Sequence, residues 1–175
     1  LVTGVQTCAL PICFQGVVAI SLLSVKSTLQ TPLGTRGSLS GSLRRTYFDQ
    51  TIGRRSDDIP DYYFYDGHIK AAVDLSDVDR LILGFFGGRD VLDITYGGAS
   101  KNKSGFGVAW QNQTASARYV RVFTPRFFGQ FGLTTSRFAS DFAFSEGSIE
   151  ERNVVNDVTL KGHVQYDRSS SMRAE

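Results

Sequence analysis

The chain has 175 residues, which is enough for one ordinary domain. Its 19 Lys and Arg residues nearly balance its 17 Asp and Glu residues, and the net charge of +2 gives no electrostatic case for binding nucleic acid or an acidic substrate. No apolar run approaches the roughly 20 residues that a membrane helix needs. This excludes helical membrane spans, but it does not exclude spanning strands, whose lipid-facing and lumen-facing residues alternate.

The first twelve residues stand apart from the rest. Residues 2–12 read VTGVQTCALPI, a string that resembles the conceptual translation of a sequencing adapter. We therefore treat residues 1–12 as artefactual, expect them to lack a packed structure, and take residues 13–175 as the protein sequence. This interpretation removes Cys8 and places Cys13 at the junction, so we expect no disulfide or metal framework.

From Gly16 onward, strand-like runs alternate with breaks. The clearest run is His68–Leu75, in which Ile69 and Val73 fall on one face while His68 and Lys70 fall on the other. Such a period of two predicts a strand with one apolar and one polar face. The sequence predicts eight strands in all: Gly16–Leu22, Ser24–Leu33, Gly37–Phe48, Tyr62–Leu75, Arg80–Leu92, Gly105–Phe123, Phe127–Phe142 and Asn153–Tyr166. The strand Gly105–Phe123 is predicted to end near Phe123, because the alternation fails there and Arg121 falls among the apolar positions.

The breaks between these strands alternate in length. The short breaks are rich in Pro, Gly, Ser and Asp, the residues of tight turns, and they are Pro32–Arg36, Ser76–Asp79 and Thr124–Arg126. The long breaks are polar and charged, and they are Gln50–Asp61, Asp93–Ser104 and Phe144–Arg152. A meander whose connections are short at one end of the sheet and long at the other is typical of transmembrane barrels, which have short periplasmic turns and long extracellular loops.

The predicted fold is therefore all-β, an antiparallel up-and-down meander of about eight strands that forms part of a transmembrane β-barrel wall. Several predicted strands reach or exceed the 9–11 residues of a tilted membrane strand. Aromatic residues gather near the strand ends, as in Tyr62–Tyr65 and at Phe123, Phe127 and Phe128. Rings at these positions suit the two membrane interfaces.

Four segments carry a family resemblance. Residues 22–49, LLSVKSTLQTPLGTRGSLSGSLRRTYFD, resemble the opening barrel hairpin of TonB-dependent receptors of the Bacteroidota type. Residues 61–66, DYYFYD, and residues 79–87, DRLILGFFG, resemble the next two strands of that family, and residues 110–128, WQNQTASARYVRVFTPRFF, resemble a later turn and its flanking strands. Gln111 stands where the family usually has Gly. The resemblance spans about residues 16 to 167.

The resemblance implies a barrel of about 22 strands with a plugged lumen, integral to the bacterial outer membrane. It implies uptake of a nutrient ligand of the siderophore, cobalamin or glycan class, driven by TonB-type coupling. The plug and the coupling segment would lie N-terminal to this fragment. The expected partners are outer-membrane lipids and the extracellular nutrient, with no nucleic acid. The alternatives are a self-contained eight-stranded barrel, either an outer-membrane structural protein or a lipocalin-like carrier, and an adhesive surface barrel.

The sequence predicts no enzyme, no cofactor and no metal site, and it assigns no ligand-binding residue. His68 and His163 lie on the polar face without further ligands at metal-binding spacing. Clustered carboxylates at Asp57, Asp58 and Asp61 could bind calcium, although loop charge explains them better. The arginines that flank a long loop could attract phosphate groups at an outer rim, although a charged strand end just outside the bilayer explains them better; they are Arg44, Arg45, Arg54 and Arg55. Asn102-Lys103-Ser104 and Asn112-Gln113-Thr114 match the glycosylation pattern, but such tripeptides also occur by chance and the bacterial setting argues against modification.

Overall fold

The computed structural model describes residues 13–47, 50, 60–96, 104–144, 149–169 and 172–174. The predicted artefactual segment, residues 1–12, lies outside these residues. The strands are β1 (Gln15–Ile20), β2 (Ser24–Pro32), β3 (Gly37–Thr46), β4 (Asp61–Asp74), β5 (Asp79–Tyr96), β6 (Ser104–Thr124), β7 (Phe127–Phe144), β8 (Ile149–Ser169) and β9 (Met172–Ala174). In the described part of the chain, no helix is long and apolar enough to cross a membrane.

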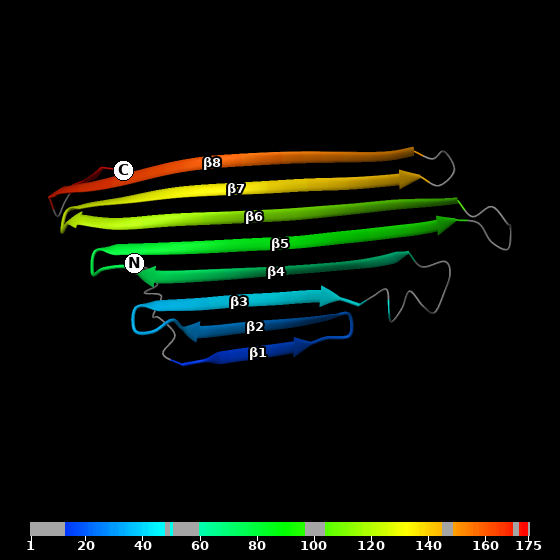
Figure 1. Cartoon of the computed structure of the whole chain (residues 1–175), viewed down its shortest axis with the longest axis horizontal. Coiled ribbons are helices and arrows are strands. Elements are labelled where there is room, and N and C mark those ends of the chain that lie inside the picture. Colours follow the sequence, from blue (N-terminus) through cyan, green and yellow to red (C-terminus); the bar gives the residue numbers. More distant parts are fainter. Residues whose placement is uncertain are drawn as a thin grey trace.

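All the strands belong to one sheet in chain order, and every neighbouring pair is antiparallel. The sheet is open, because β1 forms one edge and the three-residue β9 follows β8 at the other. Figure 1 shows the β2–β3, β4–β5 and β6–β7 turns together at one end of the sheet and the longer connections at the opposite end. The predicted antiparallel meander is therefore confirmed.

The short turns use the residues that the sequence predicted for them. Gly34, between β2 and β3, has a φ of 62°, a conformation that residues with a Cβ rarely adopt. The turn closes when the Leu33 amide donates to the Gly37 carbonyl at 2.9 Å. Between β4 and β5, the Ser76 hydroxyl donates to the Asp79 carboxylate at 2.7 Å. These local bonds fix the register of the β2–β3 and β4–β5 hairpins.

Several predicted strand ends were wrong at the end of the sheet opposite the turns. β7 continues to Phe144 and β8 already begins at Ile149, so the predicted loop Phe144–Arg152 shrinks to residues 145–148. Phe144 and Ile149 pair across the two strands. Phe106 lies next to this pair, with its ring centroid 5.3 Å from that of Phe144. Contacts between rings on adjacent strands extend the pairing beyond the point where the sequence turns polar.

Because paired residues share a face, the register divides the sheet into two surfaces. One surface, the apolar face, carries the rung Leu39, Ala71, Leu83, Ala117, Leu133 and Leu160. The other surface, the polar face, carries the neighbouring rung Ser40, Lys70, Gly84, Ser116, Thr134 and Thr159. The predicted faces of the β4 and β8 segments are therefore confirmed, since Ile69 and Val158 share one surface and His68 and Lys161 point to the other.

The apolar residues form a band that slants across the strands. On β1 and β2 it lies toward the long connections, at Val18, Ile20 and Val25, whereas on β8 it reaches toward the short turns, at Val164 and Tyr166. A band parallel to a membrane would cross tilted strands at such a slant. On β4 the apolar face has no charged side chain from residue 63 to residue 73, roughly 33 Å of strand, or about 25 Å along the normal at a tilt of about 40°.

The sheet is a single layer and has almost no core. Among the described residues, only Val91, Val108 and Ala139 are buried apolar residues, and no large side chain is fully buried. The chain exposes 13150 Å², whereas a compact 19.2 kDa protein exposes roughly 8,400 Å². Because a sheet is stable only when its apolar face is covered, another phase or partner has to cover this one.

Candidate functional site

The polar face has a hollow of about 780 Å³ over β4 to β8. Gly84 and Gly132 lie beneath it, where the absence of side chains leaves room. Its polar lining comes from His68, Lys70, Thr114, Ser116, Arg118, Gln130, Thr134, Lys161 and His163. No carboxylate is among the residues that line it.

Three cations define the electrostatics of this hollow. Lys70, Arg118 and Lys161 line it, and none of them takes part in the ion pairs formed within the described residues. Arg118 and Lys161 lie on the same rung, one on each side of Gly132. The hollow therefore presents positive charge and hydrogen-bonding groups, an arrangement that attracts anionic or polyhydroxylated molecules.

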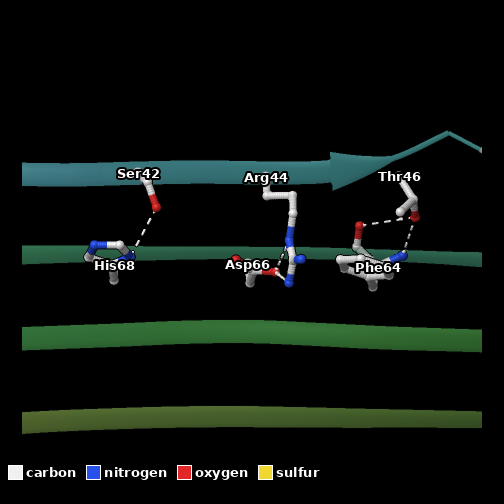
Figure 2. Close-up of polar contacts among 6 residues, drawn as sticks. All are labelled: Ser42, Arg44, Thr46, Phe64, Asp66 and His68. Atoms are coloured by element: carbon white, nitrogen blue, oxygen red, sulfur yellow. Dashed lines mark hydrogen bonds and ion pairs between the residues drawn. The ribbon is translucent and has the colours of Figure 1, made fainter. Parts of the chain in front are cut away.

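A row of cross-strand polar contacts borders the hollow along β3 and β4, as Figure 2 shows. Ser42 Oγ and His68 Nδ1 share a hydrogen bond of 2.9 Å. The Arg44 guanidinium donates from Nε and Nη2 to the same oxygen of Asp66, at 2.8 and 2.5 Å. The Phe64 amide donates to the Thr46 hydroxyl at 2.8 Å. These contacts hold the side chains in fixed positions at an otherwise solvated surface.

Toward the long connections, the polar face becomes aromatic. Phe106, Phe142 and Phe144 form a cluster with ring centroids 4.9 to 5.3 Å apart. Trp110 lies four residues farther along β6 on the same face and is 38% exposed. Sequence reasoning missed this cluster, although the alternation Phe-x-Val-x-Trp in β6 was a signal for it. Exposed rings beside a polar surface can stack on flat or carbohydrate-like ligands.

An ionic cluster marks the short-turn end, outside the apolar band. Asp79, the first residue of β5, accepts hydrogen bonds from the hydroxyls of Tyr119 and Ser76, and Arg121 lies 3.5 Å from it. The bond from Tyr119, followed by that from Ser76, holds the pKa of the Asp79 carboxyl below its usual value. Arg121 therefore stays within β6, and the strand end that the sequence predicted near Phe123 falls only at Thr124.

The two histidines that the sequence placed on the polar face, His68 and His163, both line the hollow on that face. His68 is bonded to Ser42, and His163 lies on β8, four strands away in the sheet. Within the described ranges, no group of three His, Cys, Asp or Glu side chains could hold a metal ion. Asp57 and Asp58 lie outside the described residues, so the carboxylate cluster with Asp61 stays a prediction.

Arg44 and Arg45, the two of the four rim arginines that the structure describes, do not converge. Arg44 points to the polar face and bonds Asp66, whereas Arg45 points to the apolar face and lies 5.6 Å from the Tyr63 ring centroid. Arg54 and Arg55 lie outside the described residues. Of the two glycosylation tripeptides, Asn112-Gln113-Thr114 lies within β6, and Asn102 and Lys103 are not among the described residues.

Searches against protein-family models, curated proteins and solved structures found no match to this chain.

Proposed function

We propose that this chain is part of the wall of an outer-membrane receptor that takes up a nutrient of the siderophore, cobalamin or glycan class by TonB-type energy coupling, and that it is not an enzyme. One observation carries the membrane part of the proposal: a long single-layer sheet exposes a slanted apolar band on one face and polar side chains at the same depth on the other. Leu133 and Leu160, in the middle of the band, are 49% and 80% exposed. In a membrane, lipid would cover them.

The polar face then lines the lumen. The hollow with Lys70, Arg118 and Lys161 and the aromatic cluster at Phe106 lie on this face, where a ligand or a plug would pass. Short turns at one end and longer connections at the other support the same orientation, with the turns on the periplasmic side. The family resemblance of residues 16 to 167 supports the uptake function.

The open sheet favours the reading that this chain is a piece of a wider wall, rather than a self-contained eight-stranded barrel. β1 has six residues, whereas β8, near the other edge, has 21. Joining two edges of such different length would leave most backbone groups on the outer side of β8 without partners. In hydrocarbon each such group costs several kcal/mol.

Spin-label accessibility tests the orientation of the sheet. Single cysteines at Leu83, Leu133 and Leu160 sample the apolar face, and cysteines at Gly84, Thr134 and Lys161 are their matched neighbours on the polar face. The native cysteines are replaced by serine. In the vesicle-bound chain, we expect the first set to collide mainly with molecular oxygen and the second set mainly with a water-soluble nickel chelate. Equal nickel accessibility for both sets would contradict a membrane wall.

Deletion of the gene that encodes the chain tests the uptake part. We expect the mutant to lose growth when one nutrient of the three classes is supplied at low concentration, and to regain it with a plasmid copy. The growth defect should disappear at high concentration, where diffusion through general pores suffices. Normal growth on all three classes would overturn uptake while leaving the membrane orientation untouched.

A further inference from the structure

The apolar face has its own hollow, at the edge of the apolar band toward the long connections. It measures about 590 Å³ and extends over β2 to β6, away from both edges of the sheet. Gly67 and Gly87, which pair across β4 and β5, form its floor. Leu43, Ile69 and Phe85 line it with apolar surface. The hollow therefore exists because two glycines meet in register on a face that otherwise carries large side chains.

The opposite side of the same hollow is cationic. Arg45 and Arg89 lie one rung closer to the long connections, together with Tyr65 and Gln111. Arg45 lies over the Tyr63 ring. The side chain of Arg89 makes no hydrogen bond or ion pair within the described part of the chain and is only partly exposed. The one carboxylate that lines the hollow, Asp66, points to the polar face, where Arg44 already neutralises it.

The cationic side continues beyond the hollow. A second, smaller hollow of about 170 Å³ lies beside it on the same face, with Gln111, Gln113, Arg137 and Arg152 in its lining. Arg152 lies 3.4 Å from Asp141, whereas Arg137 has no ion pair among the described residues. Guanidinium groups thus follow the border of the apolar band from β3 to β8. At this border, a membrane changes from hydrocarbon to phosphate headgroups.

From this arrangement we propose that the hollow over Gly67 and Gly87 binds one anionic, phosphate-bearing lipid of the membrane, an inference that rests on the proposed function. Its acyl chain lies over the two glycines against Leu43 and Phe85. Its phosphate accepts hydrogen bonds from Arg89, and Arg45 adds a second positive charge. Apolar lining, a glycine floor and an unpaired arginine at successive depths match such a lipid from chain to headgroup. Arginine is suited to this role because its planar fork binds two phosphate oxygens at once.

Site-specific lipid quenching tests the proposal. Ser27, which lines the hollow, is replaced by cysteine in a chain without other cysteines and carries a fluorophore; a second chain carries it at Val158, in the apolar band on β8. Vesicles contain phosphatidylglycerol or phosphatidylcholine with a quencher high on the acyl chain. We expect phosphatidylglycerol to be preferred about 3- to 10-fold at residue 27, the size of a partly exposed charge-assisted contact, and hardly at all at residue 158.

Two variants separate the headgroup from the chain. Arg89→Gln should abolish the preference for phosphatidylglycerol, and Arg89→Lys should retain part of it. Lys26→Gln, which removes an equal charge from the polar face of β2, should change nothing. Gly87→Val should reduce quenching by both lipids, because a side chain there would fill the floor. A Cβ at residue 87 fits, since its nearest neighbour is the Phe85 ring at 3.5 Å, whereas at Gly67 it would lie 2.6 Å from Leu43.

The outcomes distinguish this proposal from the function on which it rests. Equal preference for phosphatidylglycerol at residues 27 and 158, or a preference that survives in Arg89→Gln, would overturn the lipid site while leaving the membrane wall intact. Absence of quenching at Val158 by either lipid would instead contradict the membrane wall itself. A preference that is confined to residue 27 and is lost in Arg89→Gln supports both.

Discussion

Replacing Leu133 with arginine is expected to weaken the association of the chain with lipid vesicles by roughly 30-fold to 1,000-fold. Leu133 lies in the middle of the apolar band, on the rung that it shares with Ala117 and Leu160, and it is 49% exposed. An arginine at the lipid-facing midplane of a barrel costs about 2–4 kcal/mol, and each 1.4 kcal/mol changes an equilibrium about tenfold. Flotation of the chain with phosphatidylcholine vesicles, over a range of lipid concentrations, measures the partition constant.

Ser136→Arg is the matched control for this experiment. Ser136 lies on the same strand but on the polar face, where it pairs with Asp157, so the added charge has an acidic neighbour and water. We expect its partition constant to stay close to that of the unmodified chain, because residues on a lumenal face do not enter lipid. Similar losses for Leu133→Arg and Ser136→Arg would show that charge anywhere in the sheet is harmful, and that the two faces are not lipid and lumen.

The two faces were predictable because the period of a strand is two. Ile69 and Val73 had to share one side of any strand that contains both. The short turns, such as the one at Gly34 between β2 and β3, fixed registers in which the apolar sides of adjacent strands coincide. Shifting any strand by one residue would have placed its apolar residues among Lys70 and its polar neighbours. The all-β fold could therefore be inferred from local patterns alone.

The strand ends away from the turns were less predictable. The sequence around Phe144 and Glu150 is polar and glycine-bearing, and its local propensity favours a loop. Pairing there depends on Phe106, which is far away in the sequence and reaches Phe142 and Phe144 only after β6 and β7 are aligned. By contrast, the strand end predicted at Phe123 lies beside a short turn and is within one residue of the observed end of β6 at Thr124.

The candidate sites depend even more on pairing between distant residues. Gly67 and Gly87 are unremarkable in the sequence, and they create a hollow only because the β4–β5 register places them opposite each other. Arg89 reaches the edge of that hollow through the same register. The cations of the polar face, Lys70 and Lys161, likewise lie on strands that are four apart in the sheet. No local sequence motif indicates that these residues are neighbours in the folded sheet.

Residues 13–175, produced alone, are expected not to form a closed, stable barrel. Closure links the number of strands, their tilt and the register shift around the barrel. A sheet shaped for a wall of about 22 strands has a shallow curvature. Here the edge strand β1 and the strand β8, which lies next to the short β9 at the other edge, differ in length by 15 residues. Their outer backbone groups should stay unpaired, and unpaired edges recruit other chains. In water, the exposed band around Leu133 and Leu160 adds a second route to aggregation.

Refolding in detergent measures this directly. We expect a heterogeneous product without a heat-modifiable monomer band in electrophoresis, because a change in mobility on heating is the signature of a closed barrel. Hydrogen exchange on the detergent-solubilised chain should be fast for amides on the outer sides of β1 and β8 and slow in β5 and β6, which are paired on both sides. A monodisperse, heat-modifiable monomer whose edge amides near Val17 and Val164 are protected would require β1 and β8 to pair. That result would favour the self-contained eight-stranded barrel and would remove the wider wall from the proposal.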